Sequence, residues 1–481
     1  MRYGTVVVGA GSAGAVVAAR LSQRSDHQVL LLEAGPDHHS AQTPEGISGD
    51  SFFEAISEPG RTFEGLTAQH VDGAPERLYQ RGRGVGGSSA VNAMIGLWGM
   101  PGDYDRWERD LGCDEWSWRD VAPVFASLAV PLTRALPAEW GSVDRALVDA
   151  AQMLGHPYCT DALVPSALGV GPAWLTRAAG RRVSVNDAYL EPARARANLT
   201  VRGHAVVDRV VLDGRRAAGV RLSDGELIEA AEVVVCAGAI HSPAVLLRSS
   251  IDRTGIGQGL RDHASASITL ALSEDARNDP ASLAVATMLR WSSSSGSGDL
   301  QLLPVNHLGR APQAEGLGVL MAAIMSVYSR GSVSLRTADA NDDPVVRFSM
   351  LADERDVAKL REAVRHMVRL IETDAFRRIT DAVFIDGIGT PLAALPDDDA
   401  ALEVWLRAHV ADYVHASSSC RMGPAGDELA VVDTRCRVHG YEALRVCDAS
   451  VFPDLPRANT HLPAVMVAER IAAFMQAERD A

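Results

Sequence analysis

The sequence predicts an α/β fold in which a Rossmann-like domain is interrupted by a discontinuous second domain of antiparallel sheet plus helices. Three observations predict it. A β-α-β unit spans residues 5–33, where an apolar run, a glycine-rich turn with a helical pattern and a second apolar run follow one another. Residues 199–235 alternate β-rich runs with turns. Residues 268–350 read mostly as strands, and an amphipathic helical pattern follows at 353–376.

The remaining elements follow in chain order. Residues 36–80 read as loop-rich, and 103–127 carry helix-compatible patterns with three tryptophans. The Asp-Gly pairs at 213–214 and 224–225 predict hairpin turns. A final helix is expected from Leu462, with Pro463 in its first turn.

A chain of 481 residues is too long for one simple core, so two domains are expected. Glycine loops cluster early and the β-rich insert lies in the middle, which indicates one discontinuous domain closed by another. The predicted cofactor domain comprises residues 1–127, 186–267 and 405–481. The predicted substrate domain comprises residues 128–185 and 268–404.

The composition excludes several classes of function. The hydrophobic content of 47% is that of an ordinary globular protein, and a net charge of −15 argues against nucleic-acid binding. No apolar run reaches the roughly 18 residues that a membrane-spanning helix needs. The six cysteines are scattered without a C-x-x-C pair, so we expect no metal site and no disulfide. A cytoplasmic protein is the expectation, and a homo-oligomer is compatible with it.

The first glycine loop predicts dinucleotide binding. GAGSAG places Gly9, Gly11 and Gly14 between a strand and a helix, with Ser12 and Ala13 between the glycines. Glycines there allow a tight turn, close approach to a pyrophosphate and close helix packing. Glu33, followed by Ala34, ends the next strand, where a carboxylate can accept from a ribose hydroxyl. The loop alone could be a glycine-rich turn, and it does not separate NAD from FAD.

A second glycine loop favours FAD. The segment RGRGVGGSSAVNAMIGLWG starts at Arg81. A nicotinamide enzyme has no obvious use for such a loop, whereas the broad isoalloxazine ring of a flavin needs close backbone contact along one edge. A turn between two helices is the structural alternative.

The chain resembles the glucose–methanol–choline (GMC) oxidoreductase family. The resemblance rests on these two loops and on DYDRW, VVVCAGAIHSPAVLL, LRDHA and LRVCDASVFPDLPRANTHLPAVMVAERI, in the family's order. It implies FAD as cofactor, held without a covalent bond because Val91 stands where some members attach the flavin through a histidine. The segment 249–263 is shorter than usual, and His241 stands where asparagine is more common.

The resemblance also implies which residues hold FAD. In the second loop, residues 92–94 would lie nearest the ring, and the backbone around Val206 would touch the adenine. The implied cofactor residues beyond the first loop are Arg83, Gly86, Gly87, Ser88, Asn92, Ala93, Met94, Val206, Ala237, Gly238, Asp448, Ala449, Asn459, Thr460, His461 and Leu462.

The resemblance implies that two late histidines are the catalytic pair. His415 opens HASSSCRMG, a motif that has lost the family's proline, glycine and threonine, and His461 lies in the NTH element. An imidazole accepts a proton near neutral pH, and a second imidazole or amide can stabilise a developing alkoxide. We assign His415 as the base and His461 as the partner of the substrate oxygen, although the roles could be exchanged. His366, His409 and His439 lack such context and are expected to be packing or surface residues.

The expected function is FAD-dependent oxidation of an alcohol to an aldehyde or ketone, with reoxidation by dioxygen, a quinone or another carrier. A flavin-containing lyase resembling hydroxynitrile lyases is the alternative within the family. An NAD-linked dehydrogenase is a third hypothesis, which the second glycine loop disfavours. The sequence does not identify the alcohol.

Overall fold

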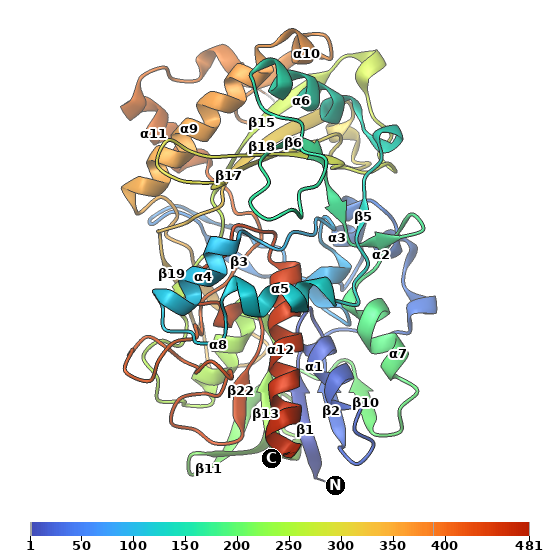
Figure 1. Cartoon of the computed structure of the whole chain (residues 1–481), viewed down its shortest axis with the longest axis vertical. Coiled ribbons are helices and arrows are strands. Elements are labelled where there is room, and N and C mark those ends of the chain that lie inside the picture. The colour runs from blue at the N-terminus through green and yellow to red at the C-terminus, as the bar shows by residue number, and fades with distance from the viewer. Residues whose placement is uncertain (1, 388, 481) are drawn as a thin grey trace.

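A parallel sheet forms the core of the half of the molecule that holds both chain ends (Figure 1). The computed structural model describes residues 2–387 and 389–480. Five parallel strands run in the order β10 (Leu199–Arg202), β2 (Val29–Leu32), β1 (Tyr3–Val8), β13 (Leu227–Val235) and β22 (Leu444–Val446). The apolar runs predicted as buried strands fill its centre: every residue of β2 is buried. Helices α1 (Gly14–Leu21) and α12 (His461–Asp480) pack together beside it.

An antiparallel extension continues from β13. Strands β11 (Val207–Asp213) and β12 (Arg216–Leu222) join it as consecutive hairpins. Gly214 and Gly225 adopt φ of +59° and +93° in the connecting turns, which is the conformation that favours glycine. Both predicted hairpins are therefore confirmed.

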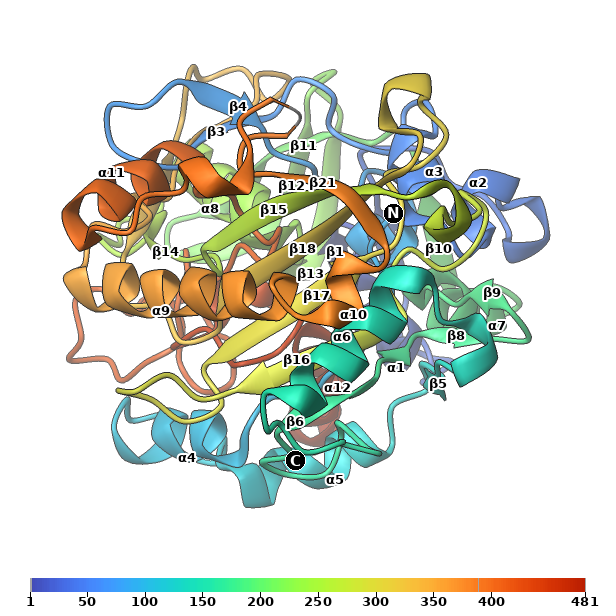
Figure 2. The ribbon, with the colours of Figure 1, turned by 90° about the horizontal axis from the view of Figure 1, so that it is seen from above.

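The other half of the molecule is built on an antiparallel sheet of six strands. The order is β21 (Thr380–Phe384), β15 (Ser265–Leu272), β18 (Leu317–Ile324), β17 (Leu300–Val305), β16 (Thr287–Trp291) and β6 (Gly169–Pro172). Helices α9 (Glu354–Ile371) and α6 (Ser142–Met153) cover one face (Figure 2). Because side chains alternate along a strand, Leu320 and Ala322 pack under these helices while Met321 points to the opposite face.

Shorter elements join the two halves. A five-stranded sheet runs β14 (Gln258–Leu260), β19 (Gly331–Ser334), β20 (Val345–Arg347), β3 (Thr67–Gln69), β4 (Glu76–Leu78). Two further pairs are β5 (Thr133–Arg134) with β7 (Trp174–Leu175), and β8 (Arg177–Ala178) with β9 (Arg181–Arg182). The remaining helices are α2 (Glu45–Ser48), α3 (Phe52–Ser57), α4 (Pro101–Arg109), α5 (Trp118–Ala126), α7 (Glu191–Ala193), α8 (Gly238–Arg248), α10 (Asp374–Arg377) and α11 (Asp399–His409).

Two expectations need correction. The loop-rich segment 36–80 contains α2, α3, β3 and β4. Strand β3 pairs with β4 and also with the distant β20, and a local pattern cannot show the second pairing. The helix expected over 353–376 ends at Ile371, and the separate turn α10 follows after Thr373.

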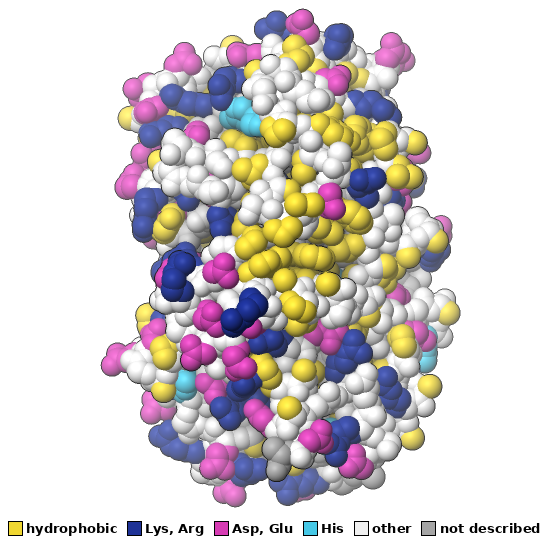
Figure 3. All heavy atoms as spheres, in the orientation of Figure 1, with side chains coloured by type: hydrophobic (Ala, Val, Ile, Leu, Met, Phe, Trp, Pro, Cys, Tyr) yellow, Lys and Arg dark blue, Asp and Glu magenta, His cyan; other side chains and the backbone are white. Residues whose placement is uncertain are grey.

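The predicted fold class is confirmed, and the domain boundaries stay a prediction. Charged side chains of both signs are interspersed over the face in Figure 3, and an apolar area crosses its middle. Within the described residues, no helix is both long and apolar enough to cross a bilayer. The same residues hold no group of three or more His, Cys, Asp or Glu side chains suited to a metal ion.

Candidate active site

One cavity of about 620 Å³ lies between the carboxyl ends of the parallel strands and the six-stranded sheet. Ligands of open α/β sheets bind at that edge. The predicted site residues that line it are Gly9, Gly11, Ser12, Ala13, Glu33, Ala34, Arg83, Gly87, Ser88, Asn92, Ala93, Met94, Val206, Ala237, Gly238, His415, Asp448, Ala449, Asn459, Thr460 and His461. Three others lie behind this lining, namely Gly14, Gly86 and Leu462.

The first glycine loop leaves the N-terminus of α1 open toward the cavity. Gly9 has φ +97°, and a Cβ on Gly14 would lie 1.9 Å from the Gly9 carbonyl oxygen, so neither position accepts a side chain. Among the described residues, no side chain caps the start of α1. Free amides and the helix dipole at such an end favour a phosphate.

Glu33 ties the two glycine loops together. One carboxylate oxygen accepts from the backbone N–H of Ala10 at 2.8 Å, and the other accepts from Gly35 at 2.9 Å and Gly84 at 2.8 Å. A carboxylate has about four acceptor positions, so capacity remains for a ribose hydroxyl. The sequence predicted that Glu33 binds a ribose, but it did not predict these three hydrogen bonds between Glu33 and the backbone of the loops.

The loops touch at Gly11 and Gly87. Gly87 has φ +51°, and a Cβ built on it would lie 2.6 Å from the Gly11 Cα. Gly87 therefore cannot carry a side chain here, whereas a Cβ on Gly11 would lie at an ordinary 3.8 Å from the Gly87 Cα. The second loop therefore closes one side of the cavity by lying directly on the first.

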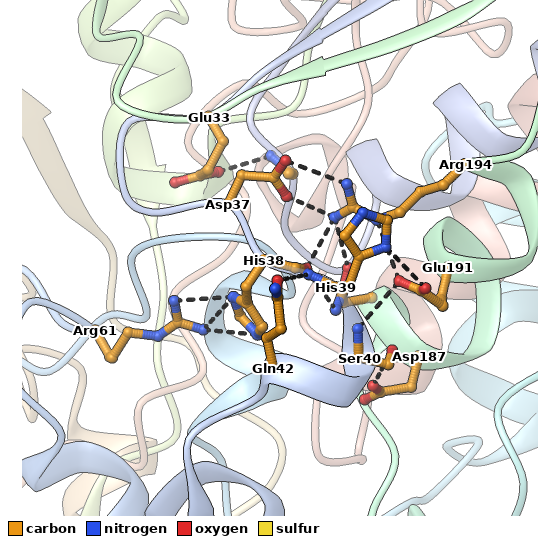
Figure 4. Close-up of polar contacts among 12 residues, drawn as sticks. Glu33, Asp37, His38, His39, Ser40, Gln42, Arg61, Asp187, Glu191 and Arg194 are labelled. Atoms are coloured by element: carbon orange, nitrogen blue, oxygen red, sulfur yellow. Dashed lines mark hydrogen bonds and ion pairs between the residues drawn. The ribbon is translucent and has the colours of Figure 1, made fainter. Parts of the chain in front are cut away.

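Behind Glu33, a polar cluster supports the loop that leaves β2 (Figure 4). Asp37 pairs with Arg194 at 2.5 Å, and the buried Arg61 donates to His38 Nδ1 at 3.2 and 3.3 Å. Burial and the neighbouring Arg61 lower the pKa of His38 to about 4. His38 is therefore neutral at physiological pH.

Asp448 follows β22 and braces the start of α8. Its Oδ2 accepts from the Gly238 backbone N–H at 2.8 Å and from the Ser242 hydroxyl at 2.5 Å. Burial raises its pKa. These bonds fix the backbone at Gly238, which the resemblance predicts to lie near the cofactor, at the cavity wall.

His415 is held from two directions at the far end of the cavity. Its backbone N–H donates to Asp262 Oδ1 at 2.9 Å, and its Nδ1 lies 2.9 Å from His263 Nδ1. Its Nε2 lies 3.4 Å from the Asn459 amide nitrogen. Val414 just before it has φ +55°, a strained conformation for a β-branched residue. Burial, and then His263 and Arg81, lower the pKa of His415 well below the ordinary histidine value.

His461 lies on the same cavity but faces the first glycine loop. It is the first residue of α12, and its Nδ1 lies 3.0 Å from the Ser12 hydroxyl. Its buried Nε2 has no hydrogen-bond partner among the described residues. Burial and Arg182 lower its pKa to about 4. Asn459, two residues earlier, is the NTH residue that contacts His415.

Sequence reasoning missed the buried residues around His415. Asp262 and His263 belong to LRDHA, which was read only as a family signature. Tyr79 donates to Asp262 Oδ2 at 2.8 Å and accepts from the Ala416 N–H at 3.2 Å. The three histidines expected to be packing or surface residues do not line this cavity. His366 contacts His156, His409 contacts the Trp405 carbonyl, and His439 contacts the Gly423 carbonyl.

Comparison with known protein families agrees with this geometry. The N-terminal GMC oxidoreductase profile matches residues 3–265, and the C-terminal one matches residues 327–468. The chain belongs to the GMC oxidoreductase family. It is an FAD-dependent oxidoreductase of the class acting on CH–OH groups, as the motifs predicted.

Similar proteins cover the whole chain. A 5-(hydroxymethyl)furfural oxidase of Methylovorus sp. is 32% identical, over 97% of each chain. An oxygen-dependent choline dehydrogenase of Pectobacterium atrosepticum is 30% identical, over 98% of this GMC oxidoreductase and 94% of the relative. The crystal structure of a pyridoxine 4-oxidase from Mesorbium loti superposes with a TM-score of 0.89 at 26% identity, over 99% of both chains.

The residues of this GMC oxidoreductase fit FAD. The glycine loops and the open α1 terminus suit the pyrophosphate, and Glu33 suits a ribose. At the other end, His461 Nε2 and Asn459 Oδ1 are buried polar atoms without partners in the described chain. Such atoms are costly unless a ligand satisfies them, which FAD and a substrate would do.

We expect Gly87→Ala to lose most FAD binding. The new methyl group would meet Gly11 at 2.6 Å and would force the two loops apart. FAD content of the purified variant, from the flavin-to-protein absorbance ratio, measures the effect. Gly73→Ala is a matched control, because Gly73 also has a positive φ but nothing lies within 4 Å of its added Cβ. Equal FAD content in both variants would contradict the predicted contact between the loops.

Stability is expected to fall as the pH decreases from about 6.5 toward 4. The pKa values of His38 and His461 are about 4 and that of His263 is about 3, whereas histidines of an unfolded chain titrate near 6.5. Between these values the unfolded chain binds more protons, so the free energy of unfolding decreases with falling pH. Urea unfolding at pH 7.5, 6.5 and 5.5 measures the free energy of unfolding at each pH. A midpoint that is constant or rises toward acid would contradict the assignment of neutral buried histidines.

Proposed function

We propose that this enzyme oxidises an uncharged alcohol to an aldehyde or ketone, with His415 as the base and the Asn459 amide as the partner of the substrate oxygen. The observation that carries the proposal is the contact of His415 Nε2 with the Asn459 amide nitrogen at 3.4 Å, inside a cavity formed by both glycine loops. His461 was the predicted second group, and its contact with Ser12 supports a role in holding FAD instead.

The chemistry divides into a proton and a hydride. The substrate O–H bond breaks and its proton goes to His415 Nε2, while the hydrogen on the carbinol carbon leaves as a hydride and a C=O bond forms. FAD supplies the hydride acceptor when bound. An amide N–H from Asn459 stabilises the charge that develops on the substrate oxygen. His415 begins neutral because burial lowers its pKa, so the base is ready at physiological pH.

The substrate side of the cavity supports an uncharged, largely apolar alcohol. Leu303 and Met321 oppose each other on neighbouring strands, and both line the cavity, as do Phe52 and Ile56 of α3. A charged substrate would lose its hydration against these four apolar side chains, none of which offers it a hydrogen bond or an opposite charge.

The electron acceptor, the form of the cofactor and the location belong to the same proposal. The names of the two relatives include an oxidase and an oxygen-dependent dehydrogenase, so we propose dioxygen as the first acceptor to test, before quinones or other carriers. FAD is bound without a covalent bond, because Val91 offers no nucleophile at the cavity wall. The six free cysteines suit the reducing cytoplasm.

Anaerobic stopped-flow mixing with a panel of alcohols tests the proposal. Uncharged benzylic, furanic and aliphatic primary alcohols are expected to bleach the oxidised-flavin absorption. Choline and sugars are expected to leave that absorption unchanged. Admission of dioxygen is then expected to restore the absorption. A flavin that stays oxidised with every alcohol would reject alcohol oxidation. If a cyanohydrin were cleaved by that oxidised enzyme, the lyase alternative would be favoured.

A further inference from the structure

We propose that His263 is a positioning residue that fixes the proton of His415 on Nδ1. His415 Nε2 then carries a lone pair, which takes the substrate proton once the substrate hydroxyl replaces the Asn459 N–H at that nitrogen. This inference rests on the proposed role of His415 as the base. His263 itself does not line the cavity, and it acts through the His415 ring.

The two imidazoles form a direct contact in the protein interior. Their Nδ1 atoms lie 2.9 Å apart, and the ring planes are perpendicular, with centroids at 5.1 Å. His263 is fully buried and His415 is 8% exposed. A water molecule has no room in a 2.9 Å contact, so the rings share a hydrogen directly.

A hydrogen bond between two ring nitrogens needs one N–H and one lone pair. Both rings are neutral, because burial lowers the pKa of His263 to about 3, and burial together with His263 and Arg81 lowers the pKa of His415 well below the ordinary histidine value. A neutral imidazole carries its proton on only one nitrogen. If His415 donates from Nδ1, its Nε2 is an acceptor; if His263 donates, His415 Nε2 carries a hydrogen and cannot act as a base.

The contact of His415 with Asn459 favours the first arrangement. The Asn459 amide nitrogen faces His415 Nε2 and is a donor, which requires a lone pair on Nε2. His263 then carries its hydrogen on Nε2, a buried atom that has no hydrogen-bond partner among the described residues. The contact with Asn459 is thus the observation that favours a proton on His415 Nδ1.

The neighbouring residue of His263 holds the backbone of the base. Asp262 Oδ1 accepts from the His415 N–H, and Tyr79 bridges Asp262 and the Ala416 N–H. The charged groups that act on this region are Arg81, which lowers the pKa of His415, and Asp412, which with burial raises the pKa of Asp262 to about 7. Two consecutive residues of LRDHA thus control the backbone and the ring of the same histidine.

The arrangement also assists the proton transfer. When Nε2 of His415 takes the substrate proton, the ring becomes an imidazolium and its Nδ1–H···Nδ1 bond to His263 becomes charge-assisted, which strengthens it. No proton has to move on to His263 for this gain. The role corresponds to that of a group that fixes a catalytic histidine's tautomer.

The test compares two substitutions of His263. His263→Asn keeps an acceptor oxygen near the original Nδ1 position, and His263→Phe fills the space without an acceptor. We expect flavin reduction by the best alcohol to slow by about 10–100-fold in the Phe variant and by less than about 5-fold in the Asn variant. Equal loss in both variants would indicate a packing role and overturn the proposal, and so would a normal rate in the Phe variant.

The tautomer itself gives a readout that is independent of turnover. In enzyme labelled with ¹⁵N-histidine, the His415 signals, assigned by their loss in His415→Gln, should show a protonated Nδ1 and an unprotonated Nε2. The opposite pattern in the wild-type enzyme would overturn the proposal, even if His263→Phe did not fold. If no alcohol reduced the flavin, the proposed function would fail while this spectrum still decided the tautomer.

Discussion

Replacing His415 by glutamine is expected to slow anaerobic flavin reduction by about 10²- to 10⁴-fold while the enzyme keeps its FAD. General base catalysis by a positioned side chain contributes a factor of this size. Glutamine can still hydrogen-bond but cannot accept a proton at neutral pH. The measurement is the limiting reduction rate at saturating alcohol, together with the FAD content of the variant.

The matched control for His415→Gln is His439→Gln. His439 does not line the cavity, and its Nε2 lies 3.0 Å from the Gly423 carbonyl oxygen. We expect its variant to reduce at the wild-type rate. If the two variants reduced equally fast, His415 would not be the base.

Asn459→Ala is expected to lower the reduction rate by about 10²- to 10³-fold, the usual cost of removing one donor that stabilises a developing oxyanion. The substitution deletes the amide 3.4 Å from His415 Nε2 and leaves the His415–His263 contact in place. The same stopped-flow measurement applies, and the apparent affinity for the alcohol should change less than the rate.

His461→Gln separates the two candidates for the second group. Its Ser12 contact predicts a weaker hold on FAD and a reduction rate within about tenfold of wild type once FAD is saturating. A large loss of rate in this variant combined with a near-normal Asn459→Ala would restore His461 as the catalytic partner.

Much of the fold could be predicted because its signals are local. The β-α-β unit, both Asp-Gly hairpins and the final helix follow from apolar spacing and glycine position. The pairing of β3 with β20 could not, since that sheet joins segments nearly 280 residues apart by backbone hydrogen bonds alone.

The residues of the site likewise include some that local sequence signals predict and others that only the three-dimensional structure brings together. The first glycine loop was predicted from motif spacing and His415 from the resemblance to the GMC family, and the structure places both at one cavity. Three features of the site join residues that lie up to 152 positions apart, and motif spacing does not reveal them. They are the hydrogen bonds of Glu33 to the loop backbone, the contact of Asn459 with His415, and the His263–His415 pair. Between Asn459 and His461, only the direction of each side chain distinguishes the roles.

Carbonyl product formed per FAD in an anaerobic single turnover tests the central claim most directly. The account predicts one equivalent of aldehyde or ketone for each flavin bleached, with both signals appearing together and both slowed in parallel by His415→Gln. Product without bleaching, or bleaching at an unchanged rate in that variant, would contradict it.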